Sequence, residues 1–88
     1  MTLKIERTFG KCTPRIRLSG DFRVDHLQQV KAEIESCGPR VALDLGELDL
    51  VDVEAVRFLN GCHADGIRMM HCSRYIREWM RRERGQAS

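Results

Sequence analysis

The sequence predicts an α/β protein: a mixed four-stranded sheet packed by about three helices, in the element order β-β-α-β-α-β-α. The first observation is a nearly continuous apolar run at residues 41–45, interrupted by Asp44, which is typical of a strand covered on both faces. The second is that Asp52 follows soon afterwards, with the chemistry of a helix N-cap. Strand-helix-strand alternation in the second half favours right-handed crossovers and parallel pairing.

The chain opens with two alternating segments that predict an antiparallel hairpin. The apolar side chains that share a face are Leu3, Ile5 and Phe9 in the first segment, and Ile16 and Leu18 in the second. Between them, the Gly and Pro of residues 10–14 mark a turn.

The first helix is predicted to begin at Asp25, an N-cap with Gln28 three residues later, and to end at residues 38–39. Its apolar stripe is Leu27, Val30, Ile34 and Cys37. After the strand at residues 41–45, a second helix is expected at residues 53–64, and Asp65 with Gly66 ends it. Residues 67–72 predict another strand. Ser73 then caps a final helix whose stripe is Tyr75, Ile76, Trp79 and Met80.

Length and composition predict one small domain at residues 1–84 with a frayed tail at 85–88. Hydrophobic content of 42% and charged content of 32% are those of an ordinary globular chain, and neither a signal-peptide core nor a membrane span is present. We therefore expect a cytoplasmic protein without a membrane partner. The four scattered cysteines have no Cys-x-x-Cys spacing, so small buried thiols are expected and no metal or cofactor is predicted.

The charge is uneven: five arginines and two glutamates between Arg74 and Arg84 give the last helix a balance of +3. This basic helix could contact the phosphates of a nucleic acid. We disfavour that reading because the same segment carries an apolar stripe, and Glu78 lies at helical spacing from several of the arginines.

Several segments, taken together and in order, resemble the STAS domain of bacterial anti-sigma factor antagonists and sulfate transporters. They are residues 16–20, 41–45, 50–55 and 72–76 and the first helix. The resemblance implies a non-catalytic module for signalling and transcription regulation, whose partner is a regulatory protein such as an anti-sigma-type serine kinase. Antagonists of this type carry Asp-Ser-Ser-Gly at the start of the second helix, where a kinase phosphorylates a serine.

This chain departs from that pattern, because its acceptor position is Glu54. Arg23 likewise stands where the family tends to have an Asp. We hypothesise that Arg23 pairs with Glu54, whose fixed charge partly mimics the phosphorylated state. The plainer interpretation is that Glu54 only favours the helix dipole. The alternative function is a small-anion or nucleotide sensor at this helix N-terminus.

The sequence therefore predicts a partner-binding surface and no catalytic residues. Its candidate residues are Asp21, Arg23, Asp44, Asp52, Glu54 and Arg57. Ser19 and Ser73 have no triad partners in an evident arrangement, and no Gly-rich phosphate loop is present, which argues against an enzyme. A homodimer is expected, because apolar area around Phe58, Tyr75 or Trp79 would otherwise stay uncovered.

Overall fold

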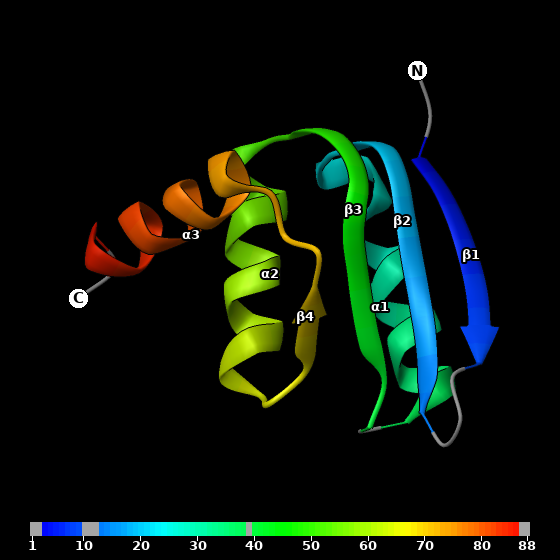
Figure 1. Ribbon diagram of the computed structural model, residues 1–88. Helices are drawn as coiled ribbons and strands as arrows, with labels where there is room; N and C mark the ends of the chain where they lie inside the picture. The colour runs from blue at the N-terminus through cyan, green and yellow to red at the C-terminus, as the bar shows by residue number, and fades with distance from the viewer. Residues whose placement is uncertain (1–2, 10–12, 39, 87–88) are drawn as a thin grey trace.

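The computed structural model describes residues 3–9, 13–38 and 40–86. They form strands and helices in the predicted order, with a short 3₁₀ turn, η1, before the first helix (Figure 1). The elements are β1 (Leu3–Phe9), β2 (Pro14–Phe22), η1 (Val24–His26), α1 (Leu27–Cys37), β3 (Ala42–Val51), α2 (Val53–Ala64), β4 (Arg68–Met70) and α3 (Arg74–Gln86). Most of the predicted hairpin turn, including Cys12, and the side chain of Phe9 lie outside the described residues.

The strands form one sheet whose spatial order, β1-β2-β3-β4, is also the order of the chain. β1 and β2 are antiparallel, whereas β2–β3 and β3–β4 are parallel. The helices α1 and α2 are thus crossovers between parallel neighbours, as strand-helix-strand alternation requires. The predicted mixed four-stranded sheet is confirmed.

One face of the sheet buries the core. Ile16 and Leu18 of β2 are fully buried beside Leu43 of β3, while the alternating Arg15 and Arg17 are exposed on the other face. All three helices contribute to the same cluster: Val30 from α1, Val56 and Leu59 from α2, and Ile76 and Met80 from α3. None of the helices in the described residues is long and apolar enough to cross a lipid bilayer.

β3 is longer than predicted, because it continues through Val51. Its pairing with β2 shifts on the way: Arg17 faces Asp44, but Ser19 faces Glu47, so β3 carries an additional residue there. A second shift follows at the next pair of positions. Bulges of this kind break the alternation of apolar and polar residues, which is why the sequence did not indicate a strand beyond residue 45.

Smaller differences concern the ends of elements. Asp25 is not the N-cap of α1, because it lies inside η1 and α1 begins at Leu27. β4 has three residues in place of the six expected, and α3 includes the backbone of Gly85 and Gln86. By contrast, α2 has the predicted bounds, and Ser73 caps α3 as expected, its Oγ accepting a hydrogen bond from Ile76 N at 3.3 Å.

Candidate partner-binding site

The carboxyl ends of β2 and β3 lie at one edge of the sheet, where α2 also begins (Figure 1). Asp52 connects these elements. Its Oδ1 accepts a hydrogen bond from Ala55 N at 2.8 Å, and its Oδ2 accepts one from Val24 N at 2.9 Å. Its own amide donates to the carbonyl of Phe22 at 3.3 Å. The predicted N-cap is confirmed, and the same carboxylate also holds the segment that follows β2.

Asp21 and Arg23 form an ion pair at the end of β2. Asp21 is only 4% exposed, and Nη2 of Arg23 lies 3.7 Å from its Oδ2, whereas the side chain of Arg23 is 55% exposed. The hypothesised pair between Arg23 and Glu54 is therefore wrong. Arg23 is two residues from Asp21 in the chain, and this local carboxylate holds it instead.

Glu54 pairs with Arg57 on the first turns of α2, with 3.3 Å between Oε1 and Nη1. The same guanidinium reaches Glu83 of α3, with Nε 3.1 Å from Oε1. One arginine thus lies between two carboxylates, and the cluster of three side chains keeps a net charge of −1. The charge of Glu54 is fixed but partly neutralised, so it is a weaker mimic of a phosphate than an unpaired carboxylate would be.

Asp44 is the third residue of β3 and lies away from this edge. Its Oδ1 accepts a hydrogen bond from Gly46 N at 3.0 Å and lies 3.2 Å from Nδ1 of His71, and Nε of Arg17 is 3.6 Å from Oδ2. Burial raises the pKa of Asp44, but the Gly46 amide, His71 and Arg17 favour the carboxylate and together hold that pKa below its usual value. Asp44 is therefore a buried anchor between strands.

The six predicted residues separate into two groups. The carboxylates of Asp44 and Asp52 accept hydrogen bonds from backbone amides, and so they position the backbone. The carboxylate of Asp21 is buried and is paired with Arg23. The side chains of Arg23, Glu54 and Arg57 are 55%, 48% and 62% exposed, so they can contact another molecule. The structure brings together all of these residues except Asp44.

Three exposed apolar residues near Asp52 were missed by sequence reasoning, and together they are called the apolar patch. Val24 is 50% exposed, Leu50 46% and Val53 37%, and they are three of the four large exposed apolar residues in the described chain. Val24 is bonded to Asp52 through its amide, while Leu50 and Val53 are within two residues of Asp52 in the chain. Leu50 next to Val51 was a usable signal, because adjacent residues of a strand point to opposite faces.

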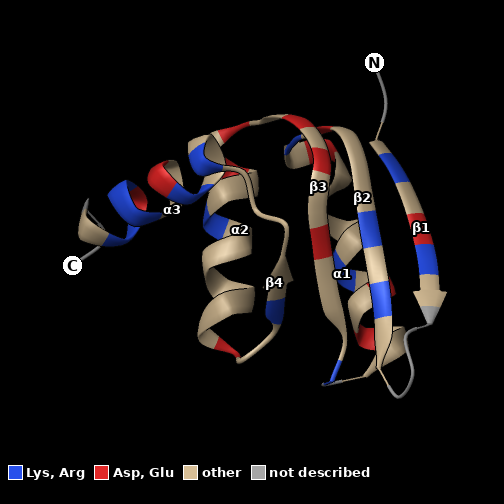
Figure 2. Ribbon diagram, viewed as in Figure 1, with Lys and Arg blue, Asp and Glu red and all other residues tan. Residues whose placement is uncertain are grey.

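The charge distribution follows the sequence expectation. Figure 2 shows acidic positions where β3 leads into α2, and arginines along α3. Within the described residues, no group of three His, Cys, Asp or Glu side chains is placed to hold a metal ion. His71 contacts Asp44, while the neighbouring Cys72 packs against the core on the side where the helices lie.

Phe58 and Trp79, named for a dimer contact, are partly buried in this structure. Phe58 packs edge-on against Phe22 with 5.9 Å between ring centroids, and Trp79 lies 5.9 Å from Tyr75. Tyr75 is 52% exposed. Self-association through this region stays a prediction, with Tyr75 as its most exposed residue.

Comparison with known structures places this fold. The antisigma-factor antagonist STAS domain from Rhodobacter sphaeroides matches with a TM-score of 0.61 and 14% identity, over 78% of this chain and 86% of that one. The anti-sigma factor antagonist SpoIIAA in its unphosphorylated form matches with a TM-score of 0.62 and 19% identity, over 88% and 79%. A structure of Mglu matches with a TM-score of 0.53 and 21% identity, over 76% of this chain but 18% of that chain.

Sequence comparison provides less information than structural comparison. No protein-family profile matches the chain. A short chain dehydrogenase, rstn4, of Aspergillus nomiae is 32% identical over 68 residues, which are 76% of this chain. The chain spans only 18% of the length of that curated relative. The matches to the two antagonist structures cover most of both chains, and their common architecture is the mixed sheet with its helices. The protein therefore has the fold of the STAS domain, as the resemblance of its sequence segments predicted.

Proposed function

We propose that this chain is a non-catalytic interaction module that binds a regulatory protein through the patch of Val24, Leu50 and Val53. The exposed apolar patch is the observation that supports this most. Apolar residues surrounded by charged side chains are typical of protein interfaces, and Arg23, Glu54 and Arg57 provide such a rim. The patch is also at the strand edge that the resemblance to antagonists indicates.

The partner we propose is a cytoplasmic regulatory protein of the anti-sigma type, in the first place a serine kinase. The likeness in fold to two anti-sigma factor antagonists supports this choice. Glu54 occupies the position that the resemblance assigns to the phosphorylated serine, and a carboxylate cannot accept a phosphate in that way. Binding would then not be switched by phosphorylation at residue 54, and its charge would be constant.

The alternative of an anion or nucleotide sensor at the same helix end is less well supported. The carboxylate of Asp52 already accepts a hydrogen bond from the Ala55 amide, and Glu54 adds negative charge to the first turn of α2. Both features disfavour an anionic ligand at this N-terminus. A dehydrogenase activity has no support in these 88 residues, since they lack the Gly-x-Gly-x-x-Gly motif of dinucleotide sites.

The test is a titration by calorimetry of purified anti-sigma-type serine kinases, encoded with this chain, against four forms of it. These are the native chain, Leu50→Lys, Glu54→Lys and, as a matched control at the opposite edge of the sheet, Arg40→Glu. We expect the native chain and the control to bind equally, and the two site variants to bind about tenfold or more weakly. Equal affinity of all four forms would show that the partner binds at a different surface.

A second set of variants tests whether the charge of Glu54 affects the affinity for the partner. If its fixed charge sets the partner affinity, then Glu54→Gln and Glu54→Ser change the dissociation constant, and incubation of Glu54→Ser with kinase and ATP restores it. Unchanged affinity in both variants would show that Glu54 has no role beyond the helix dipole. Failure of every kinase to bind the native chain would reject the proposed partner class.

A further inference from the structure

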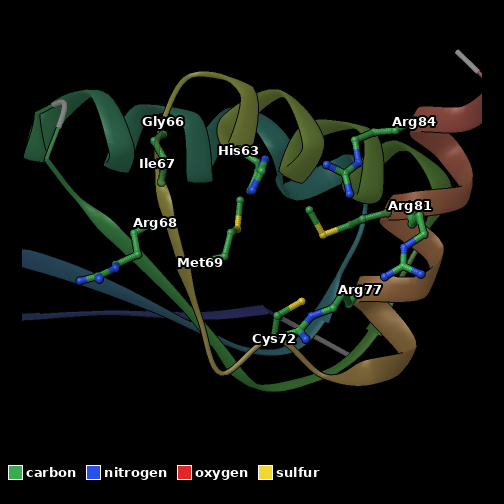
Figure 3. A pocket seen from close by; sticks show the side chains of 10 residues that line it. His63, Gly66, Ile67, Arg68, Met69, Cys72, Arg77, Arg81 and Arg84 are labelled. Atoms are coloured by element: carbon green, nitrogen blue, oxygen red, sulfur yellow. The ribbon is translucent and has the colours of Figure 1, made fainter. Parts of the chain in front are cut away.

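A groove lies between the end of α2, β4 and α3, away from the candidate partner-binding site (Figure 3). Its volume is about 540 Å³. Ile67, Met69, Cys72 and Met80 line it with apolar or weakly polar atoms, and all four are partly or fully buried. Volumes between roughly 300 and 1,000 Å³ are usual for small-molecule sites.

Arginines of one helix form the other side of this groove. Arg77, Arg81 and Arg84 are spaced at i, i+4 and i+7, so they line one side of α3 over about 10 Å. Figure 3 shows the guanidinium of Arg84 directed toward the hollow, whereas Arg68 points away from it. In the part of the chain that the structure describes, no carboxylate lies within ion-pair distance of these three arginines, although Arg57 nearby is paired with Glu83.

We propose that this groove binds a single-chain amphiphile with an anionic head group, a carboxylate or a phosphate. An apolar chain placed over Met69 and Met80 would be removed from water, which favours binding in proportion to the area buried. The head group would be bound by Arg77, Arg81 and Arg84, since guanidinium groups match the geometry of carboxylate and phosphate oxygens. An anion there would also relieve the repulsion among these three cations.

The dimensions favour a small molecule over an acidic peptide. The arginines extend over only two turns of α3, and the apolar lining consists of the side chains of Ile67, Met69, Cys72 and Met80. The groove shares no residue with the proposed partner-binding surface. The inference therefore holds whether or not that partner is confirmed.

The methionines of the chain provide a direct measurement. Met69 and Met80 line the groove, whereas Met70 alternates with Met69 on β4 and lies against a different hollow, beside Arg15 and Ala42. In NMR spectra of the full chain labelled with ¹³C at the methionine methyls, we titrate decyl phosphate below its micelle concentration. We expect saturable shifts of the Met69 and Met80 signals and no shift of Met70.

Head-group specificity is tested with decanoate and with neutral decyl maltoside, which keep the chain length. Decyl phosphate should bind most tightly, decanoate next, and decyl maltoside about tenfold or more weakly than decyl phosphate, because only the first two can pair with the arginines. Equal binding of the neutral amphiphile, or equal shifts of all three methionines, would show detergent-like adsorption and overturn the proposal.

Variants of exposed arginines separate recognition from folding. The triple variant Arg77→Gln, Arg81→Gln and Arg84→Gln should bind decyl phosphate about tenfold more weakly, because each exposed charge pair contributes modestly. The matched control, Arg74→Gln with Arg82→Gln, removes charge from α3 outside the groove and should bind as the native chain does. Native affinity in the triple variant overturns the proposal. So do shifts of Met69 and Met80 caused by an oligoglutamate peptide but not by decyl phosphate.

Discussion

Val24 and Asp52 are 28 positions apart in the chain, and a hydrogen bond of 2.9 Å from Val24 N to Asp52 Oδ2 joins them. The other oxygen of this carboxylate accepts the amide of Ala55 at 2.8 Å. One side chain thus sets the positions of both the segment after β2 and the start of α2. This link joins the backbone segments that carry the exposed residues Val24 and Val53.

Replacing Asp52 by Ala should lower the free energy of unfolding by about 2 kcal/mol, because two backbone amides lose their acceptor. Asp52→Asn keeps one acceptor oxygen and should cost about half as much. Urea denaturation followed by circular dichroism measures both. Asp49→Ala, which removes an exposed acid three positions earlier, is the control. A loss in Asp52→Ala no larger than in the control would contradict the linking role.

Glu54 and Arg57 should matter little for stability. Their side chains are 48% and 62% exposed, and exposed ion pairs contribute about 0.2–1 kcal/mol. Glu54→Gln and Arg57→Gln should therefore each change the free energy of unfolding by less than about 1 kcal/mol. These variants are therefore suitable for binding experiments, because a change in affinity would not result from unfolding. A loss above about 2 kcal/mol in either variant would assign the pair a structural role instead.

Asp44 should stabilise the fold in a pH-dependent way. Its pKa is lowered in the folded state, so its stabilising effect is present above the ordinary value of 3.8 and is lost as the pH falls through the folded pKa. Asp44→Asn should cost about 1–3 kcal/mol at pH 7 and less near pH 3. Urea unfolding of both proteins across this range tests it, with Asp49→Asn as control. A difference between native and variant that is independent of pH would contradict the assignment.

Gly46 and His71 are in close approach. A Cβ atom on Gly46 would lie 3.0 Å from the Cβ of His71, and His71 itself has a left-handed backbone with φ of 56°. Gly46→Ala should therefore destabilise the protein by about 1–3 kcal/mol. His71→Gly removes the close contact with the Cβ of His71 and the left-handed strain, but it also removes the contact with Asp44, so the loss in the double variant should be smaller than the sum of the two single losses. Additive losses in thermal or urea unfolding would show that the two sites are independent.

Cys62 should be the slow cysteine in alkylation. Burial, with a smaller contribution from Asp65, raises its pKa to about 11, so only about one thiol in a thousand is ionised at pH 8. Because the folded state favours the protonated thiol, this contribution to stability is present below pH 9 and is lost between about pH 9 and 11. Mass spectrometry after timed iodoacetamide treatment should show Cys62 labelled after Cys37. Faster labelling of Cys62 would contradict its burial.

The bounds of an element were predicted best where the residues at its ends are themselves capping or helix-ending residues. α2 begins after a side-chain cap at Asp52 and ends before Gly66, and both signals are local. The length of β3 could not be predicted in this way. Its end depends on bulges opposite Ser19 and Asp21, and those follow from the pairing with β2, a contact between distant segments.

The candidate site was predicted in its charges but not in its apolar centre. The resemblance to antagonists indicated Arg23, Glu54 and Arg57, while an unbroken strand would have placed Leu48 and Leu50, two residues apart, on the same face, although Leu48 is buried and Leu50 exposed. That distinction arises because the second register shift of β3 changes which face each residue takes. The groove beside α3 was missed for a similar reason, since it depends on how α3 packs against α2 and β4.

The order of the strands in space has a consequence for how this protein forms during translation. The strands β1, β2, β3 and β4 are neighbours in the order in which they leave the ribosome. The strand with which each of β2, β3 and β4 pairs has therefore been synthesised before it. None of these four described strands has to insert between two others. At each stage, the strand made last is at an edge of the sheet and can pair with the next strand. The sheet can therefore grow from β1 toward β4 in the order of synthesis.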